Sequence, residues 1–411
     1  MSDIPVQIGL FGFGCVGQGF YRIFQEQQSE IQAQIRKIVV KNPNKERPIA
    51  TGKFYFQAQD ILNDPAISLV VEAIDDAEAA YLIAKTALQS GKHVVSANKK
   101  MVALYGRELR ALASSRQRAF LYEAAVAGSI PILQLLQHYY RYDHIEWLRG
   151  IINGSTNFIL SKMHNEGVAY EAALQEAQAL GFAESDPTLD VEGFDAGYKL
   201  SILLHHAFGI EVSPERLLRE GIHRLDPLTT GYCARKDYRI KLLAQAYERG
   251  DGSVTAFVLP ALLPVQDQLA SVEQEENAIE IGLRHAHPQL LRGKGAGSTP
   301  TGAAVMADVA RVLKGYVATG KVNMKRYFYE EEVLPLWVSG NGSARRLLTH
   351  FPFHELHAHI SDARGFAFEG YARYDQVRDF LQAHPGAGIF VAHHPQLTQH
   401  KVKQAGALLP V

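Results

Sequence analysis

Short apolar runs alternate with amphipathic segments through the first third of the chain. The apolar runs have the length of strands and cover residues 6–11, 37–40, 69–74, 92–96 and 119–123. Apolar residues recur at helical spacing over residues 17–26, 77–90 and 106–115. This alternation is typical of a doubly wound parallel sheet, in which binding groups lie at the carboxyl ends of the strands. We therefore predict a Rossmann-type α/β domain over residues 1–135.

The pattern changes after residue 135. Strand-like runs at residues 147–152, 253–259 and 280–283 are expected to form a sheet. Residues 136–300 are therefore predicted to form an α+β domain that carries the substrate site and an oligomer surface. A helix over residues 301–314 is predicted to return to the first domain, within a segment that ends near residue 325.

The C-terminal part of the chain has a third pattern. Its segments follow the order strand, helix, strand, strand, helix, strand, at residues 334–338, 343–350, 354–361, 366–373, 374–383 and 388–392. This order is that of a ferredoxin-like unit, so residues 331–411 are predicted to form a small domain of that fold. Its role is either to bind a regulatory amino acid or to form a dimer contact, and we slightly prefer the latter.

Composition and charge argue against several classes of protein. The 411 residues carry a net charge of −1, which does not favour nucleic-acid binding, and no apolar run reaches the ~20 residues of a membrane span. Two cysteines, Cys15 and Cys233, are too few for a disulfide framework, and the histidines lack the spacing of zinc ligands. The first residues do not have the pattern of a signal peptide, so we expect a cytoplasmic protein.

A glycine-rich turn follows the first apolar run. It is Gly12-Phe13-Gly14-Cys15-Val16-Gly17, and it stands between a predicted strand and a predicted helix. In this context Gly12 permits the tight turn, Gly14 lets the backbone approach a pyrophosphate, and Gly17 lets the helix pack on the strand. The motif predicts a dinucleotide site, and a plain glycine-rich turn is the weaker alternative.

The loop after the second predicted strand bears on the choice of dinucleotide. It begins at Lys41 and contains Lys45 and Arg47, with no acidic residue before Glu46. An acidic residue at this place binds the ribose 2′-hydroxyl of NAD, whereas a basic residue suits the 2′-phosphate of NADP. We therefore expect NADP(H) to be preferred, with Lys41 as a phosphate ligand. NAD(H), with the loop merely solvated, is the alternative.

An acidic residue and a lysine stand four positions apart in the middle of the chain. On a helix, Asp195 and Lys199 would share one face, with the carboxylate N-terminal to the ammonium group. Most such pairs are solvated surface ion pairs. Here the apolar run 200–204 follows at once, so we predict that Lys199 lies in a buried helix and that the pair can move a proton.

A polar turn precedes this acidic segment. It is Asn153-Gly154-Ser155-Thr156-Asn157, and its polar groups can hold a small zwitterion. Asn153, Gly154 and Thr156 are therefore candidate substrate-binding residues. Thr156 or Asn157 can also cap a helix, and the two roles are compatible.

Further motifs are colinear with these and extend the pattern from residue 6 to about residue 312. They are Ser96-Ala97-Asn98-Lys99, the segments 123–132, 150–160 and 181–199, and the segment 293–301. In these motifs the chain resembles the homoserine dehydrogenase family. The resemblance implies NAD(P)-dependent interconversion of L-homoserine and L-aspartate 4-semialdehyde, a step in threonine, methionine and isoleucine biosynthesis.

The resemblance also implies roles for single residues. It makes Lys99 and Lys199 the candidate proton-transfer groups, places Lys99 beside the cofactor, and leaves open which lysine accepts the proton. Glu184 is implied to hold the α-ammonium group of the substrate, and Asp195 to position the substrate or Lys199. A lysine can act as a base if burial or a second cation lowers its pKa.

The resemblance further implies a site for a monovalent cation, Na⁺ or K⁺. Its ligands would be the carboxylate of Glu123 and the backbone carbonyl groups of Val126, Gly128 and Ile130. The alternative is a tight turn from strand to helix, with Pro131 in the first helical turn, which needs the same residues.

Two other functions fit parts of the sequence. The segment 91–95 also occurs in sugar-type oxidoreductases, so another NAD(P)-dependent reductase of similar plan is one alternative, against which Glu184 and the Asn153 turn argue. The other is a non-catalytic amino-acid sensor, which would require the loss of a catalytic group. We expect an enzyme that acts on a small molecule as a homodimer or homotetramer, with neither nucleic acid nor membrane as a partner.

Overall fold

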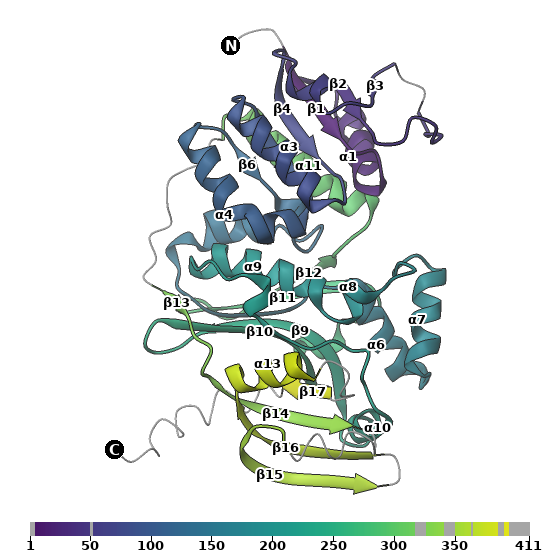
Figure 1. Ribbon diagram of the computed structural model, residues 1–411, viewed down its shortest axis with the longest axis vertical. Coiled ribbons are helices and arrows are strands. Elements are labelled where there is room, and N and C mark those ends of the chain that lie inside the picture. The colour runs from purple at the N-terminus through teal and green to yellow at the C-terminus, as the bar shows by residue number, and fades with distance from the viewer. Residues whose placement is uncertain are drawn as a thin grey trace. The chain divides into compact units, whose positions relative to one another are not determined.

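The computed structural model describes residues 5–49, 52–316, 326–340, 350–362, 365–384 and 390–393 (Figure 1). The chain divides into two compact units, each built from two separate stretches of sequence. Unit 1 comprises Met1–Tyr142 and Gly293–Met324, and unit 2 comprises Asp143–Arg292 and Lys325–Val411. No helix in the described part of the chain is both long enough and apolar enough to cross a membrane.

A six-stranded parallel sheet forms the centre of unit 1. Its strand order is β3-β2-β1-β4-β5-β6, and all neighbouring strands run parallel. The order reverses between β1 and β4, which is where a doubly wound sheet binds its ligand. The predicted Rossmann-type domain is therefore confirmed. The strands are β1 (Val6–Phe11), β2 (Ala33–Val39), β3 (Phe54–Tyr55), β4 (Ile67–Glu72), β5 (His93–Ser96) and β6 (Phe120–Leu121).

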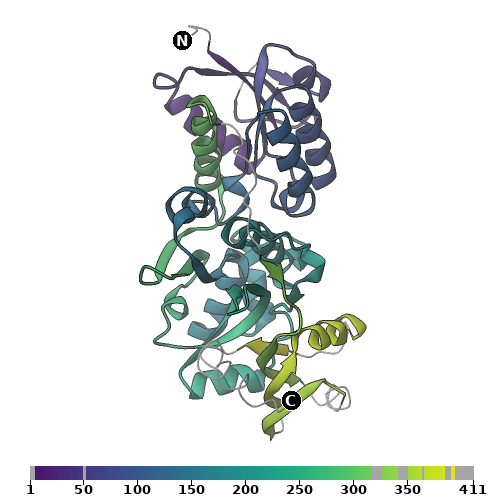
Figure 2. The ribbon, with the colours of Figure 1, turned by 90° about the vertical axis from the view of Figure 1, so that its left-hand side faces the viewer.

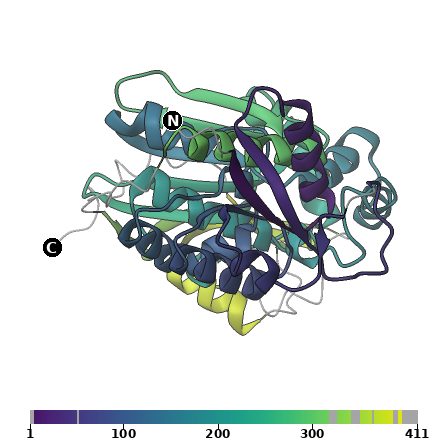
Figure 3. The ribbon, with the colours of Figure 1, turned by 90° about the horizontal axis from the view of Figure 1, so that it is seen from above.

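Helices cover both faces of this sheet. Figures 2 and 3 show α1, in purple, beside α11, in green, although the two are far apart in the sequence. The pair α3 and α4 covers the opposite face (Figure 2). The predicted returning helix thus corresponds to α11 and lies in unit 1. The helices are α1 (Cys15–Glu26), α2 (Gln59–Leu62), α3 (Ala77–Gln89), α4 (Lys99–Ser115), α5 (Ile132–Gln134) and α11 (Ser298–Leu313).

The contact between α1 and α11 depends on two glycines. A Cβ atom on Gly19 would lie 1.9 Å from the carbonyl oxygen of Ser298, and one on Gly302 would lie 2.5 Å from the backbone of Gly19. Only glycine leaves room for this approach. The Ser298 hydroxyl group also donates a hydrogen bond to the carbonyl of Cys15, which ties α11 to the start of α1.

A long mixed sheet runs through unit 2. Its order is β12-β11-β7-β9-β10-β17-β14-β16-β15, and β8 and β13 pair with β10 at the side. The sequence prediction missed β9 because its lysine, leucine, alanine and glutamine residues favour a helix as much as a strand. The first strands are β7 (Ile145–Ile151), β8 (Leu218–Arg219), β9 (Tyr238–Glu248), β10 (Ser253–Pro264), β11 (Glu276–Leu283), β12 (Gln289–Lys294) and β13 (Tyr327–Phe328).

The C-terminal part of this sheet has the ferredoxin-like strand order. In chain order its strands are 4-1-3-2 across the sheet, and α13 packs on them (Figure 1). The predicted helix over residues 343–350 falls mostly outside the described residues. Because β17 pairs with β10, this subdomain continues the sheet of unit 2. Its elements are β14 (Val333–Gly340), β15 (Phe353–Asp362), β16 (Gly365–Arg373), α13 (Tyr374–Ala383) and β17 (Phe390–His393).

One helix of unit 2 is buried along most of its length. This helix is α9, and the side chains from Asp195 to Leu204 are all buried, the polar ones included. The position of a lysine and an aspartate in such a helix requires that they be paired inside the protein. The helices of unit 2 before the ferredoxin-like subdomain are α6 (Gly154–Glu166), α7 (Tyr170–Ala179), α8 (Thr188–Val191), α9 (Phe194–Phe208) and α10 (Pro227–Arg235).

Candidate functional site

The glycine-rich turn of unit 1 has the geometry of a phosphate-binding loop. Gly12 has a φ of +89°, and a Cβ atom there would lie 2.3 Å from the carbonyl oxygen of Ala73. A Cβ atom on Gly17 would meet the carbonyl oxygen of Gly12 at the same distance. Gly14, in contrast, is exposed and has no atom within 4 Å of a Cβ position, so its side is open for a ligand.

The start of α1 supplies donors to this open side. The helix begins at Cys15, two residues earlier than predicted, so the backbone N–H groups of Cys15, Val16 and Gly17 form its first turn. First-turn N–H groups have no acceptor within their own helix and bind anions. Phe13 is buried and packs against the rings of Tyr21 and Phe54, which fixes the position of the turn.

Lys41 belongs to the basic loop that follows β2. It is exposed and follows Val40, just past the carboxyl end of β2. Arg47 of the same loop is held differently, because its guanidinium group stacks on the ring of Phe54 at 5.0 Å and donates to the carbonyl of Lys45. Lys41 is therefore the basic residue of this loop that stands nearest to the end of the strand.

A buried carboxyl group that no sequence motif predicted lies at the carboxyl end of β4. Glu72 accepts hydrogen bonds from the Ser96 hydroxyl at 2.5 Å and from the backbone N–H of Ile74 at 2.7 Å. Burial raises the pKa of Glu72 to about 7, although both hydrogen bonds oppose this shift. Glu72 is the acidic residue within the apolar run 69–74, and this exception to the pattern could have identified it.

This hydrogen-bond network leads to Lys99. The Ser96 hydroxyl accepts from the backbone N–H of Asn98, and the Asn98 side chain caps α4 by accepting from Met101 N–H at 2.8 Å. The cap makes α4 begin at Lys99 and not at residue 106, which corrects the predicted helix. Lys99 is thus the first residue of a helix whose start is anchored to β4 and β5.

Glu123 lies in a buried acidic pair. Its two carboxylate oxygens accept from the backbone N–H groups of Leu133 at 2.8 Å and Gln134 at 2.9 Å. Its own N–H donates to the carboxylate of Asp308 in α11 at 2.7 Å. Burial, followed by the nearby Asp308, raises the pKa of Glu123 to about 8, and burial raises that of Asp308 to about 6.

The turn after Glu123 has an uncommon backbone. Ala127 and Gly128 both have positive φ values, +56° and +53°, which point successive peptide groups in unusual directions. Pro131 is the N-cap residue of α5, and its side chain makes no capping hydrogen bond. The Glu123 carboxylate caps this short helix instead, because it accepts from the N–H groups of Leu133 and Gln134. The carbonyl of Ile130 accepts a hydrogen bond from Ile132 N–H. Within the described residues, no group of three or more histidine, cysteine or acidic side chains could hold a metal ion.

The second cluster of predicted residues lies in unit 2 and is buried. The ammonium group of Lys199 donates to the Asp195 carboxylate at 2.7 Å and to the carbonyl of Ile152 at 2.7 Å. The residue is 7% exposed, so the ion pair is not a solvated surface pair. The prediction that Lys199 lies in a buried helix is confirmed.

Asn153 joins this ion pair to a second carboxylate. Its amide group donates to Asp195 at 2.9 Å and to Asp190 at 2.6 Å. Its side-chain oxygen accepts from the backbone N–H and the hydroxyl of Thr156, so Asn153 also caps α6. Asp190 had no predicted role, although it stands only five residues before Asp195.

The other predicted substrate residues are placed around this cluster. Gly154 opens α6, and a Cβ atom there would lie 2.7 Å from the carbonyl oxygen of Glu275. Thr156 is buried. Glu184 is exposed in the segment after α7, and no hydrogen bond or ion pair within the described residues joins its carboxylate to Asn153, Asp195 or Lys199.

Comparisons with known proteins agree with the two halves of this description. Residues 12–123 match the family model "Homoserine dehydrogenase, NAD binding domain", and residues 131–310 match the model "Homoserine dehydrogenase". The chain belongs to the homoserine dehydrogenase family. It is 38% identical to the homoserine dehydrogenase of Bacillus subtilis over 75% of this chain and 73% of the relative, and 34% identical to that of Pseudomonas aeruginosa over 80% and 77%.

Solved structures show the same relationship. A homoserine dehydrogenase from Thiobacillus denitrificans has a TM-score of 0.82 at 32% identity, over 95% of this chain and 98% of that one. A hyperthermophilic archaeal homoserine dehydrogenase in complex with NADPH has a TM-score of 0.65 at 27% identity, over 77% and 100%. The chain is an NAD(P)-dependent oxidoreductase, and neither the other reductase nor the amino-acid sensor is favoured.

Proposed function

We propose that the cluster of Asn153, Asp195 and Lys199 binds L-homoserine or L-aspartate 4-semialdehyde and moves the proton of the reaction. The observation that supports this is the buried ion pair of Lys199 and Asp195, 2.7 Å apart. Burying two charged side chains in an apolar helix costs free energy, and such pairs are concentrated at functional sites. Asp190 joins the set as a second carboxylate on Asn153.

Lys199 is the proposed proton-transfer group. Oxidation of the alcohol removes a hydride from carbon and a proton from oxygen, and a neutral lysine can accept that proton. In the reverse direction the ammonium form returns the proton to the oxygen of the former aldehyde. Asp195 orients Lys199, and Asn153 holds Asp195. Glu184 is proposed to pair with the α-ammonium group of the substrate, and Gly154 and Thr156 to shape the turn that receives it.

The cofactor site in unit 1 is proposed to prefer NADP(H). The residues present fit a dinucleotide, because Gly14 leaves its side open and the first turn of α1 offers N–H groups to the pyrophosphate. When bound, the nicotinamide supplies or accepts the hydride. Lys41 is proposed to pair with the 2′-phosphate, and the archaeal relative in complex with NADPH supports this choice. Lys99 is proposed to lie beside the cofactor and is the alternative proton-transfer group.

Unit 1 is also proposed to bind Na⁺ or K⁺ at Glu123, with the carbonyl groups of Val126, Gly128 and Ile130. The residues fit such an ion, because a positive charge would favour the ionised form of a buried carboxyl group whose pKa is about 8. The chain is further proposed to be a cytoplasmic protein and to form a homodimer or homotetramer. Light scattering of the purified protein would test the number of subunits.

A spectrophotometric assay tests the central proposal. Purified protein is mixed with L-homoserine and either NADP⁺ or NAD⁺, and the reduced nicotinamide is followed. We expect turnover with both cofactors and a higher kcat/KM with NADP⁺. An absence of turnover with homoserine would reject the function, and a higher efficiency with NAD⁺ would reject the cofactor preference alone.

A further inference from the structure

A closed ring of hydrogen bonds, which we name the β4–β5 ring, lies at the carboxyl ends of β4 and β5 in unit 1. The Glu72 carboxylate accepts from the Ser96 hydroxyl group and from the backbone N–H of Ile74. Asn98 completes the ring, because its backbone N–H donates to the Ser96 hydroxyl group and its amide group donates to the carbonyl of Ile74, each at 3.0 Å. The ring therefore joins the loop after β4 to the segment between β5 and α4.

The side chains of this ring are buried. Glu72 and Ser96 are both 0% exposed, and Asn98 is 7% exposed. Placing a carboxyl group out of contact with water costs free energy, which hydrogen bonds offset only in part. Because Glu72 and Ser96 have no surface for a ligand to touch, they can serve a binding site only through the residues that they hold in place.

The first segment that the ring holds is the loop of residues 73–76, between β4 and α3. This loop packs on the glycine-rich turn, since a Cβ atom on Gly12 would lie 2.3 Å from the carbonyl oxygen of Ala73. The amide group of Asn98 also reaches the carbonyl of Asp75, at 3.4 Å. The ring thus fixes a loop that borders the turn where a dinucleotide binds.

The second segment is the start of α4. The side-chain oxygen of Asn98 caps this helix by accepting from Met101 N–H, and the Ser96 hydroxyl group in turn holds the backbone N–H of Asn98. Lys99 follows directly as the first residue of the helix. The ring therefore fixes the place of Lys99 and of the loop after β4 together.

The strand order of the sheet indicates which half of a dinucleotide this arrangement serves. The adenosine ribose lies at the end of β2, and the crevice crosses the sheet where the strand order reverses, between β1 and β4. The nicotinamide half therefore extends toward β4 and β5. We propose that Glu72, Ser96 and Asn98 are positioning residues for the nicotinamide half of the cofactor, which they serve by fixing the loop after β4 and Lys99. This role rests on the proposed place of Lys99 beside the cofactor.

Calorimetric titration of the full-length protein with two ligands tests this role. NADPH carries both halves of the dinucleotide, whereas adenosine 2′,5′-bisphosphate carries the adenosine half alone. Ser96→Ala breaks the ring between Glu72 and Asn98. It should weaken NADPH binding roughly three- to tenfold, the effect of one hydrogen bond, and change the affinity for the bisphosphate less than about twofold. If the protein prefers NAD(H), NADH and AMP form the matched pair of ligands.

A matched control removes a similar hydrogen bond far from the cofactor turn in the sequence. Ser339, in β14 of unit 2, is also 0% exposed, and its hydroxyl group donates to the carboxylate of Asp226. Ser339→Ala should leave the affinities for both ligands unchanged. An equal loss of NADPH affinity in Ser339→Ala, or an equal loss for both ligands in Ser96→Ala, would show that general stability is responsible and that the ring has no positioning role.

Two further variants separate the hydrogen bonds from side-chain shape and from folding. Ser96→Thr keeps the hydroxyl group and should keep the NADPH affinity within about twofold of the original. Glu72→Gln keeps the shape of the side chain, but one acceptor oxygen becomes a donor, so the bond to Ile74 or to Ser96 is lost. It covers the case in which Ser96→Ala fails to fold, and it too should weaken NADPH binding selectively.

Two results with these variants would overturn the proposal. One is an unchanged NADPH affinity in the folded Glu72→Gln protein. The other is the same loss in Ser96→Thr as in Ser96→Ala. Because none of these titrations uses homoserine, their outcome stands apart from any failure of the dehydrogenase assay.

Discussion

At the scale of single residues, burial decides which polar groups are candidates for function. Lys199, Asp195 and Asn153 are buried together, whereas Glu184 is exposed, although the sequence made all four of them candidates. The same criterion adds Glu72, whose carboxyl group lies in a fully buried position at the edge where the sheet of unit 1 binds its ligand.

The role of Lys199 can be tested against a second lysine in a similar sequence setting. Lys199→Ala should lower kcat by roughly 10²–10⁴, as expected for loss of a positioned acid-base group. Lys162 also forms an i,i+4 ion pair, with Glu166, but near the surface. Lys162→Ala should therefore leave kcat unchanged. Steady-state kinetics on both folded variants decides, and near-normal turnover of Lys199→Ala would move the proton transfer to Lys99 or to water.

Lys41 makes a prediction about cofactor choice. Lys41→Asp should lower the ratio of kcat/KM for NADP⁺ over that for NAD⁺ by roughly tenfold or more, because a charge-assisted hydrogen bond to the 2′-phosphate is replaced by repulsion. Lys45→Asp makes the same change of charge in the same exposed loop, farther from the end of β2. It should alter the ratio much less. An equal effect of both substitutions would show that only the net charge of the loop matters.

Glu72 predicts a pH-dependent stability. Its pKa of about 7 in the folded protein exceeds the ordinary value of 4.5, so the folded protein holds a proton that the unfolded chain loses between these two values. Stability contributed at this position therefore falls as the pH rises from about 4.5 to about 7 and then levels off. Glu72→Gln removes this loss. The difference in unfolding free energy between the variant and the original protein should therefore be more favourable to the variant at pH 8 than at pH 5, by on the order of 2–3 kcal/mol.

Urea unfolding at both pH values measures this difference. Glu46→Gln is the control, because Glu46 is exposed in the loop after β2. It should change the free energy of unfolding by the same small amount at both values. If Glu72→Gln behaves like this control, then Glu72 is ionised in the folded protein throughout and the pKa shift is absent.

At the scale of elements, backbone contacts between helices set where the binding loop lies. The glycine-rich turn belongs to α1, and α1 is held by α11 through Gly19, Gly302 and the Ser298 hydroxyl group. In the same way, the Asn98 cap sets the start of α4 and so the place of Lys99. The first contact joins segments far apart in the sequence and the second is local, and each of them places a candidate binding residue.

The α1–α11 contact predicts an exception to helix propensity. Alanine in place of glycine inside a helix usually stabilises it by about 1 kcal/mol. In Gly302→Ala the new methyl group would overlap the backbone of Gly19, so we expect a net destabilisation of roughly 2 kcal/mol and weaker cofactor binding. Gly250→Ala meets no atom within 4 Å and should be nearly neutral. Chemical unfolding and cofactor titration measure both effects, and a stabilised Gly302→Ala would contradict the close contact.

At the scale of the whole molecule, the ferredoxin-like subdomain shares the core of unit 2. Leu218 and Phe257 pack in one cluster with Leu336 and Val377. The hydroxyl group of Tyr374 donates to the carbonyl of Ala256 at 2.9 Å. The subdomain is therefore part of the fold of unit 2, whether or not it also binds a ligand or forms a dimer contact.

This shared core predicts the result of truncation. A chain that ends at residue 325 loses β13 to β17 and α13, which exposes Leu218, Phe257 and Leu259 and leaves an edge of β10 unpaired. We expect it to aggregate or to unfold at a markedly lower temperature. A chain that ends at residue 393 keeps all of the described elements and should melt like the full chain. A stable, active protein from the shorter chain would show that the subdomain is separable.

The sequence by itself determined the features that depend on near neighbours. Short apolar runs and apolar residues at helical spacing placed most strands and helices of unit 1. The spacing of Gly12, Gly14 and Gly17 identified the cofactor turn, because the turn is built from neighbouring residues, as the contact of Gly17 with Gly12 shows. The order of the C-terminal segments likewise predicted the ferredoxin-like strand order. The i,i+4 spacing of Asp195 and Lys199 correctly predicted a shared helix face.

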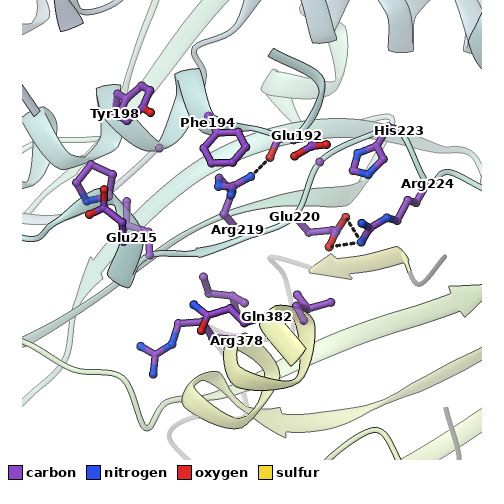
Figure 4. A pocket seen from close by; sticks show the side chains of 16 residues that line it. Glu192, Phe194, Tyr198, Glu215, Arg219, Glu220, His223, Arg224, Arg378 and Gln382 are labelled. Carbon is purple, nitrogen blue, oxygen red and sulfur yellow. Dashed lines mark hydrogen bonds and ion pairs between the residues drawn. The ribbon is translucent and has the colours of Figure 1, made fainter. Parts of the chain in front are cut away.

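Only the tertiary structure decided the features that join distant parts of the chain. Asn153 meets Asp190 and Asp195 across about forty positions of sequence, Glu72 meets Ser96, and Glu123 meets Asp308. A cavity within unit 2 is likewise lined by residues near position 219 together with residues near position 380 (Figure 4). Hydrogen bonding and charge depend on distance in space, and burial depends on everything packed around a group. A local pattern therefore names these residues without showing which of them meet.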